Sequence, residues 1–149
     1  LKAIKDDPFL AADVITGLPS EGEREFEETY AFLKGMGFSA LHVFPFSPRP
    51  GTPFFKAKDR VPESIRDERA KILRTLSTEL NDAYLRRQEG KKGEAIVLDR
   101  KGGSWYGVTG NYVDVRVVNA PLFAKRGMLL GGVFGGRSDR FMEFISGHQ

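Results

Sequence analysis

The sequence predicts an α/β segment followed by an all-β segment, and three observations support this prediction. Over residues 11–44, an apolar run that ends in glycine, a helical pattern and a second apolar run follow one another, as in a βαβ unit. A helical period then covers about 62–88. Beyond Gly90 this period disappears, and short alternating runs separated by glycine replace it. We therefore predict two domains, residues 1–89 and residues 90–149.

The N-terminal segment predicts a parallel pair of strands. Residues 11–17 form a short buried strand that ends at a glycine, and Ser20 with Glu23 fits a capping box at the start of the next helix. Residues 40–44 predict the second strand. A strand, a helix of about fifteen residues and a strand require a right-handed crossover. Such a unit with one more helix cannot bury both faces of its sheet, so we expect it to belong to a larger (βα) barrel.

A proline-rich loop follows the second strand and is a candidate ligand-binding edge. Three prolines within residues 47–53 exclude a central strand there. In (βα) barrels, ligands bind at the carboxyl ends of the strands, which nominates Ile15, Thr16, Gly17 and Leu18 on one strand and residues 44–52 on the next. A tight turn is the alternative role of Gly17. The nearby Arg49 is a candidate for binding a carboxylate or phosphate, with a solvated loop charge as the alternative.

The C-terminal segment predicts a small β-barrel. Residues Arg100 to Gly103 are expected to form a hairpin loop between the first two strands. Five strands in about sixty residues are typical of a small Greek-key barrel of the oligonucleotide-binding type. The five predicted strands are 93–99, 104–109, 112–118, 127–134 and 140–145.

Positive charge is concentrated in this predicted barrel. The whole chain has 149 residues and a net charge of +3. Residues 1–89 contain 14 basic and 15 acidic side chains, whereas residues 90–149 contain 9 and 5 and therefore carry +4. A compact basic segment favours a polyanionic partner such as nucleic acid, although a solvated basic surface is the alternative.

The barrel segment combines basic with aromatic side chains, as proteins that bind single-stranded RNA do. Trp105 and Tyr106 are adjacent in a strand, so one is expected to face the core and the other solvent. Asn111 is either a left-handed turn residue or a reader of base edges. The candidate RNA-binding residues are Lys91, Lys92, Arg100, Lys101, Tyr106, Asn111, Tyr112 and Arg116.

Several kinds of chemistry are excluded within these residues. The sequence has no cysteine, which excludes disulfides, thiolate nucleophiles and thiolate-held zinc or iron–sulfur centres. His42 has no companion histidine in its segment, so we interpret it as an interior or edge histidine and assign no metal ligand. Apolar runs are too short for a membrane span or a signal peptide, which predicts a cytoplasmic setting. Because the first residue is Leu1, we expect the chain to be a fragment.

Four ordered motifs resemble one enzyme family. Asp-Val-Ile-Thr-Gly-Leu-Pro-Ser-Glu (residues 13–21), Phe-Glu-Glu-Thr (26–29) and His-Val-Phe-Pro-Phe-Ser-Pro-Arg-Pro-Gly-Thr (42–52) resemble the C-terminal part of the radical-SAM methylthiotransferases. Gly-Val-Thr-Gly-Asn-Tyr-Val-Asp-Val (107–115) resembles their TRAM domain, most of all in the branch that modifies threonylcarbamoyladenosine in tRNA. The resemblance implies a C-terminal fragment of a radical-SAM partial TIM-type (βα) barrel, followed by a five-stranded OB-like TRAM β-barrel.

The resemblance also implies a cofactor site. The family uses S-adenosylmethionine and two [4Fe–4S] clusters, whose cysteine ligands lie upstream, so this cysteine-free fragment is expected to be inactive alone and to hold no catalytic residue. Ile15 and Gly17 match the positions beside the adenine of S-adenosylmethionine, and Phe46 and Ser47 are its implied neighbours at the next strand end. The chain departs from the broader family pattern in having Asp13 where that pattern has glycine.

The implied activity is insertion of a methylthio group at C2 of N6-threonylcarbamoyladenosine 37, with the anticodon stem-loop of tRNA as partner. One alternative is a non-catalytic TRAM-type RNA-binding module. Another is a methylthiotransferase that acts on a different tRNA adenosine derivative or on a ribosomal protein. From the uncovered barrel edge, we also expect the fragment to self-associate.

Overall fold

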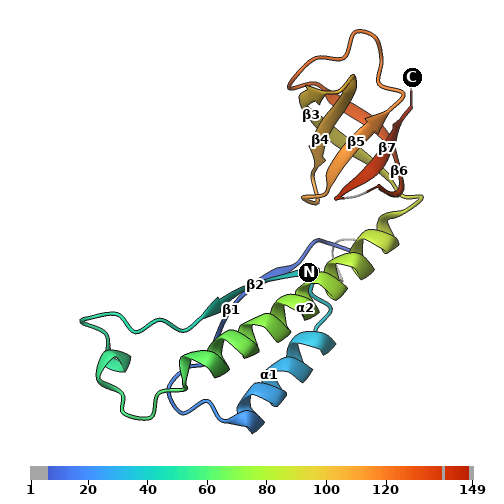
Figure 1. The fold of residues 1–149 in the computed structure, drawn as a ribbon. Coiled ribbons are helices and arrows are strands. Elements are labelled where there is room, and N and C mark those ends of the chain that lie inside the picture. The colour runs from blue at the N-terminus through green and yellow to red at the C-terminus, as the bar shows by residue number, and fades with distance from the viewer. Residues whose placement is uncertain (1–6, 139, 148–149) are drawn as a thin grey trace. The chain divides into compact units, whose positions relative to one another are not determined.

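The computed structural model describes residues 7–138 and 140–147, which form two compact units (Figure 1). One unit contains residues 9–82, and the other contains Asp7, Pro8 and the chain from Ala83 onward. The division falls inside helix α2 (Glu63–Gln88), whose last residues pack with the second unit. The assignment of residues 1–89 and 90–149 to separate functional domains stays a prediction.

The first unit is a two-stranded parallel sheet with two helices. Strand β1 (Ala11–Thr16) and strand β2 (Ala40–Pro45) pair in parallel, and helix α1 (Glu23–Gly35) connects them. A 3-10 helix, η1 (Pro53–Lys56), lies in the loop that leads to α2. The order β1, α1, β2 is that of the predicted βαβ unit.

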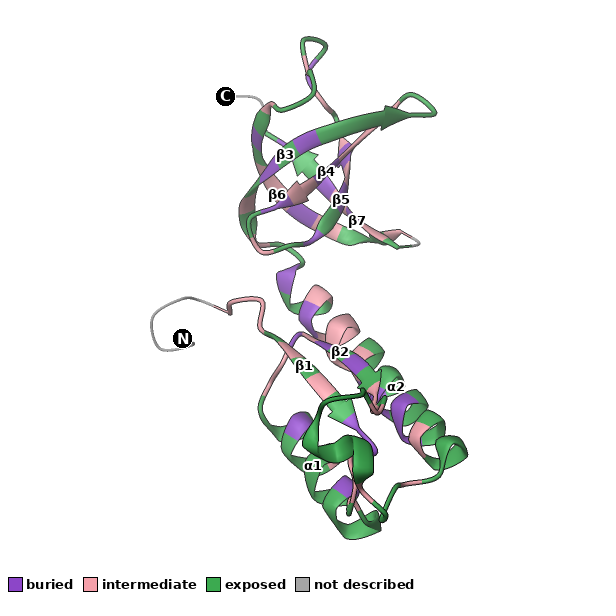
Figure 2. Cartoon of the chain, turned by 90° about the vertical axis from the view of Figure 1, so that its left-hand side faces the viewer, coloured by how far each residue is buried: buried purple, intermediate pink, exposed green. Residues whose placement is uncertain are grey.

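Alternate residues of the two strands meet different surroundings (Figure 2). Leu41 and Val43 are buried in a core formed with α1 and α2, whereas Ile15 and Phe44 are 54% and 52% exposed on the opposite face. Helices α1 and α2 therefore cover only one face of the sheet. The buried residues of this core are Phe26, Leu33, Leu41, Val43, Ala70, Leu73 and Leu76.

Helix α1 begins later than the capping box at Ser20 predicts, and that prediction is wrong. Its N-cap is Gly22, whose N–H donates to the Glu25 carboxylate (3.0 Å). Ser20 instead has a left-handed backbone (φ +67°), and its hydroxyl donates to the Asp59 carboxylate. The reason is tertiary: the carboxylate of the next residue, Glu21, folds back onto the end of β1 and adds a turn before the helix begins.

The second unit is a closed five-stranded barrel with the order β3-β4-β5-β7-β6. All neighbouring strands are antiparallel except β5 and β7, which are parallel. Its core contains the inward-facing residues of all five strands, among them Val97, Val115 and Phe144. The strands are β3 (Lys92–Lys101), β4 (Ser104–Thr109), β5 (Asp114–Val118), β6 (Leu129–Ser138) and β7 (Phe141–Ser146).

Several strand boundaries in the barrel differ from the predictions, most of all at the ends of β3 and β6. Arg100 and Lys101 belong to β3, and the turn consists of Gly102 and Gly103, whose φ values of +54° and +82° suit glycine in a two-residue hairpin. The predicted strand 127–134 extends to Ser138, because the register between β6 and β7 shifts after Phe134. The glycines that follow Phe134 thus lie within the strand, at an irregularity of its pairing with β7.

Within the residues that the structure describes, no helix is both long and apolar enough to cross a membrane.

Candidate functional site

Glu21 organises the loop after β1. Both oxygens of its carboxylate accept from the Gly17 N–H at 2.9 Å, and Oε1 also accepts from Arg69 Nη1 at 2.8 Å. Arg69 lies on α2 and is buried, and its Nη2 reaches the Glu23 carboxylate at 3.2 Å. Because the Glu21 carboxylate and the Arg69 guanidinium are both largely removed from water, each stabilises the charge of the other. Sequence analysis missed the Glu21–Arg69 pair, because 48 residues separate its two members.

Arg66, one turn earlier on α2, contacts both predicted cofactor loops. Its guanidinium donates to the backbone carbonyl of Phe46, after β2. Its aliphatic stem fills the space in which a β-carbon at Gly17 would lie, and Gly17 also has a φ of +79°. Glycine is therefore required at this position both by the backbone and by the Arg66 side chain.

A cavity of about 450 Å³ opens at the carboxyl ends of β1 and β2. Ile15, Phe46 and Ser47 line it, whereas Gly17 lies outside its lining. The Phe46 N–H donates to the carbonyl of Thr16 (2.8 Å), which joins the two strand ends. The walls are mainly apolar, and Phe44, Pro45, Arg49, Thr52 and Phe54 complete them. The structure thus brings three of the four predicted cofactor residues to one cavity.

Asp13 and His42 form a pair on the uncovered face of the sheet. They are register partners, and His42 Nδ1 lies 3.0 Å from Asp13 Oδ1. Both side chains are mostly exposed, at 76% for Asp13 and 63% for His42. They share this face with Ile15 and Phe44, since residues two apart in a strand point the same way. Strand parity could have predicted the pair, because both side chains are polar in otherwise apolar strands.

The residues present fit part of a nucleoside cofactor site but not a metal cluster. The cavity beside Ile15 combines apolar walls with the hydroxyl of Ser47 and the cation of Arg49, which suit a base and a charged tail respectively. The sequence contains no cysteine, and no group of three or more potential metal-ligating side chains occurs among the described residues. We therefore assign these residues no reaction step that involves a metal cluster.

The barrel presents two of its predicted RNA-binding cations beside the β3–β4 turn. The Arg100 guanidinium lies over the Trp105 ring, 5.6 Å from its centroid, and Lys101 Nζ lies 3.3 Å from Asp99 Oδ2. The Arg100 N–H and the Lys101 side chain both donate to Asp99 and hold the pKa of that carboxyl below its usual value. Arg100 and Lys101 are exposed, and they are the best placed of the candidate cations for a polyanion.

Tyr106 and Arg116 are register partners on the outer surface of the barrel, where both are half-buried. The Tyr106 ring contacts Phe141 (centroids 4.8 Å apart), and Arg116 donates to the Glu143 carboxylate at 2.6 Å. Tyr106 thus points outward and Trp105 packs against the core, although each ring is partly covered.

The remaining candidates lie near the end of α2, apart from Lys92, which is exposed at the start of β3. The Asn111 amide donates to the Tyr84 hydroxyl (2.8 Å) and to Gln88 Oε1 (3.3 Å), so it is engaged within the unit. Tyr112, rather than Asn111, has the left-handed backbone, with φ +58°, and its side chain is 79% exposed.

Burial and charge shift two pKa values around the end of α2. Burial raises the pKa of the Tyr84 phenol above 10.0, against the effect of the hydrogen bond from the Asn111 amide. The Arg87 side chain donates to Asp7 and lowers the pKa of that carboxyl, and Lys91 Nζ lies 3.5 Å from the same group. Lys91 is therefore partly committed to an internal ion pair.

Comparison with known proteins identifies relatives, although no family model matches the chain. The chain is 37% identical to the threonylcarbamoyladenosine tRNA methylthiotransferase MtaB of Aquifex aeolicus over 107 residues, which are 72% of this chain and 25% of the relative. Identity to the protein of the same name from Bacillus subtilis is 40% over 111 residues, or 71% of this chain and 25% of the relative. Identity to the tRNA-2-methylthio-N(6)-dimethylallyladenosine synthase of Aquifex aeolicus is 31% over 145 residues, 87% of this chain and 33% of the relative.

These similarities, together with the βαβ unit and the closed barrel, show that the chain belongs to the tRNA methylthiotransferase family. Matches at 33% to 40% identity to several threonylcarbamoyladenosine-type members support the MtaB branch of that family. The chain spans about a quarter of the length of these relatives.

Proposed function

We propose that the whole protein inserts a methylthio group at C2 of N6-threonylcarbamoyladenosine 37, beside the anticodon of tRNA, by radical S-adenosylmethionine chemistry. The names of the relatives support the reaction class. The structural observation that carries the proposal is the cavity at the carboxyl ends of β1 and β2, which contains Ile15, Phe46 and Ser47. In (βα) barrels, this edge of the sheet is where substrates and cofactors bind.

The first unit is proposed to be part of a radical-SAM partial (βα) barrel. Its two parallel strands have helices on one face only, and the other face exposes Ile15 and Phe44. Further parallel strands beside β1 or β2 would extend this sheet and enclose that face. The cavity would then open toward the interior of the barrel.

In this proposal, the first unit forms one wall of the cofactor site. S-adenosylmethionine bound at this wall would supply the radical chemistry of the proposed reaction. Ile15 and Phe46 would contact the adenine as apolar walls, and Ser47 would offer a hydroxyl to its polar groups. Glu21, through the Gly17 N–H, and Arg66, through the Phe46 carbonyl, hold the two loops in position.

The second unit is proposed to be a TRAM-type domain that binds tRNA. Arg100, Lys101 and Lys92 are exposed cations that would bind phosphates, with Tyr112 as an exposed ring. Arg116, Lys91 and Asn111 contribute less directly, because each is engaged by a partner within the unit. Tyr106 is half-buried on the outer surface of the barrel, where its ring contacts Phe141.

Titration of the 149-residue chain with tRNA at two salt concentrations tests RNA binding. We expect Arg100→Ala with Lys101→Ala to weaken binding and to reduce the salt slope by about 2, because each lost phosphate contact removes roughly 0.9. Arg24→Ala with Lys34→Ala removes the same charge from exposed positions of the first unit and is the matched control. Equal slopes for the two double variants would reject this part of the proposal.

Mass analysis of tRNA nucleosides from a strain that lacks the protein tests the substrate. Loss of the methylthio derivative of threonylcarbamoyladenosine, with accumulation of threonylcarbamoyladenosine itself, is the expected result. Loss of a different methylthio nucleoside would show that the protein acts on another tRNA nucleoside. An unchanged nucleoside profile would favour a non-catalytic RNA-binding module or a ribosomal-protein substrate.

Self-association of the chain stays a proposal. Among the described residues, β1 and β2 each have one neighbour in their sheet, so each presents an open edge, and Ile15 and Phe44 add exposed apolar surface. Sedimentation at increasing concentration is expected to show dimers or larger species, and a monomer throughout would contradict the proposal.

A further inference from the structure

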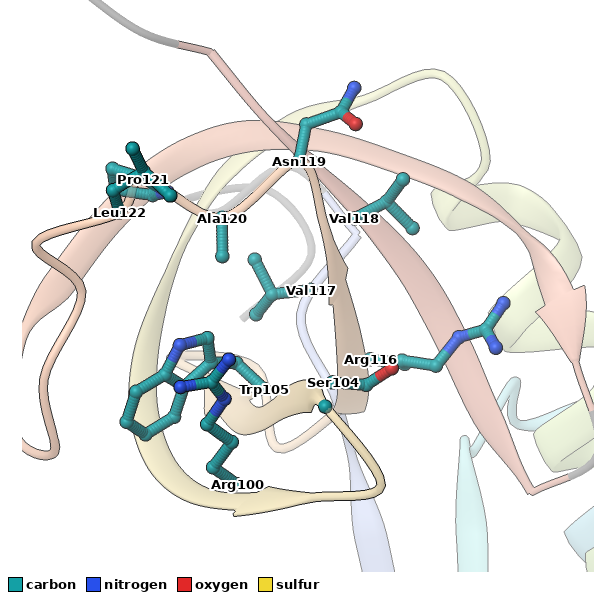
Figure 3. Close-up of a pocket in the computed structure, with 11 residues that line it drawn as sticks. Arg100, Ser104, Trp105, Arg116, Val117, Val118, Asn119, Ala120, Pro121 and Leu122 are labelled. Carbon is teal, nitrogen blue, oxygen red and sulfur yellow. The ribbon is translucent and has the colours of Figure 1, made fainter.

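Strand register in the second unit places three unlike side chains side by side (Figure 3). Arg100 of β3 is opposite Trp105 of β4, and Trp105 is opposite Val117 of β5. Their exposure decreases in this order: Arg100 is exposed, Trp105 is half-buried and Val117 is 5% exposed. The indole is therefore partly covered by the core and partly accessible.

The indole and the guanidinium form a cation–π pair. The guanidinium carbon of Arg100 lies 5.6 Å from the Trp105 ring centroid, and in Figure 3 the guanidinium overlaps the indole. The indole itself packs on Val97, Val117 and Leu130 of the core. A ring fixed in this way loses little conformational freedom when a ligand stacks on the pair.

A cavity of about 480 Å³ adjoins this pair, within the range of roughly 300–1,000 Å³ that is typical of small-ligand sites. Its opposite wall is the segment that follows β5, from which the Ala120 side chain points toward the indole in Figure 3. This wall is held in place, because the backbone carbonyl of Asn119 accepts from the Ser146 hydroxyl at 2.6 Å. Asn119 itself has a left-handed backbone, with φ +57°.

The charge of Arg100 is available at the mouth of this cavity. The nearest carboxylate in sequence, Asp99, is paired with Lys101. Arg116, the other cation in the lining, is paired with Glu143 at 2.6 Å and points away from the cavity in Figure 3. Arg100 is thus the cation best placed to neutralise a phosphate beside a base in the cavity.

We propose that this Arg100–Trp105 pocket binds a single unpaired base of an RNA, with the phosphate of that nucleotide on Arg100. The proposal rests on the proposed function, in which the barrel binds RNA. It adds the place on the barrel where RNA is recognised and the unpaired form of the recognised nucleotide. A base within a duplex has both faces covered by its neighbours, so only an unpaired base can stack on the pair. Stacking is tolerant of base identity, so the pocket selects unpaired over paired nucleotides rather than one sequence.

Intrinsic fluorescence tests the pocket directly, because Trp105 is the only tryptophan in the chain. We expect an unpaired oligoadenylate and a tRNA to quench its emission in a saturable way. An RNA duplex without unpaired bases is expected to bind through phosphates alone and to leave the emission unchanged. Fluorescence anisotropy of labelled RNA measures binding independently in the same samples.

Substitutions separate stacking from charge. By anisotropy, Trp105→Ala is expected to weaken binding of oligoadenylate about tenfold or more, since alanine substitution at a stacking ring costs about 1–3 kcal/mol per base. Trp105→Phe retains a ring on the core and is expected to retain most of the affinity, which controls for misfolding. Arg100→Ala is compared with Arg126→Ala, an exposed cation outside the cavity lining. Only Arg100→Ala is expected to lower the preference for unpaired RNA over duplex.

The outcomes distinguish this proposal from the proposed function. If tRNA binds without quenching Trp105, and Trp105→Ala leaves the preference for unpaired RNA unchanged, the pocket proposal is overturned while RNA binding by the barrel stands. If no RNA binds at low salt, RNA binding by the barrel fails as well. Quenching together with loss of the preference in the Trp105→Ala and Arg100→Ala variants supports the pocket.

Discussion

The two units position their candidate sites by different means. In the barrel every strand has two neighbours, so register alone aligns Arg100, Trp105 and Val117. In the first unit each strand has one neighbour, and the loops at the strand ends are held by side chains of α2, namely Arg66 and Arg69. A closed sheet satisfies its own backbone groups, whereas an open one depends on side-chain contacts from outside the sheet.

The largest expected effect is on the ion pair of the first unit. Arg69→Met leaves the Glu21 carboxylate, 14% exposed as a side chain, without its cation. Breaking such a pair costs about 3–5 kcal/mol, so we expect the free energy of unfolding of this unit to fall by that amount. Hydrogen exchange of the α1 amides measures it.

Arg24→Met is the matched control for this change. The Arg24–Glu28 pair is exposed, with an Nε–Oε1 distance of 2.9 Å, and its loss is expected to cost about 0.5 kcal/mol or less. Similar losses in the two variants would show that the buried pair does not hold the loop, and the contrast between the two units would be weakened.

A smaller effect is expected at Gly17. Gly17→Ala places a β-carbon in a left-handed backbone, at a cost of roughly 1–2 kcal/mol, and also displaces the Arg66 stem. Chemical denaturation of the single variants and of Gly17→Ala with Arg66→Ala separates the two terms. We expect the Gly17 substitution to cost less in the Arg66→Ala background, and strict additivity would argue against the contact.

In the second unit, Tyr84→Phe is expected to lower the free energy of unfolding by about 1 kcal/mol, through loss of the hydrogen bond from Asn111. Urea denaturation followed by the emission of Trp105 measures it.

The same phenol predicts a pH dependence. Since burial raises the pKa of Tyr84 above 10.0, the folded state holds this proton more tightly than the unfolded state. Its contribution to stability is complete below about pH 10 and is lost as the pH rises through the folded-state pKa. The Tyr84→Phe variant should show a weaker decline over this alkaline range, and an identical decline would exclude Tyr84 as the cause.

The smallest effect is expected on the uncovered face of the sheet. The Asp13–His42 pair is mostly exposed, so His42→Ala should change the free energy of unfolding by about 0–1 kcal/mol. Thermal denaturation of the chain measures it. A larger loss would show that this face is covered in solution.

Much of the secondary structure could be predicted from local pattern. The two strands predicted from the apolar runs in residues 11–17 and 40–44, the helix predicted up to Gln88 and the five predicted β-barrel strands are all present in the structure. These elements depend on where apolar side chains recur along the chain, and a single sequence contains that information. The prediction that one of Trp105 and Tyr106 faces inward also follows from strand geometry alone.

Contacts between residues distant in sequence decided the features that local pattern did not predict. The start of α1 shifted because Glu21 bonds to Gly17 and Arg69, and no local pattern contains the position of Arg69. Asn111 was interpreted as a turn residue or base reader, but Tyr84 and Gln88 of α2 engage its amide.

The sequence by itself determined the order of elements, the excess of basic residues in the second unit and, through its motifs, the family. The tertiary structure decided which cations are available and which are paired: Arg100 lies on an indole, whereas Arg116 is paired with Glu143. It also placed the Arg66 stem against Gly17. The physical reason is that periodicity depends on neighbours in sequence, whereas the pairing of a long charged side chain depends on what folding places within its reach.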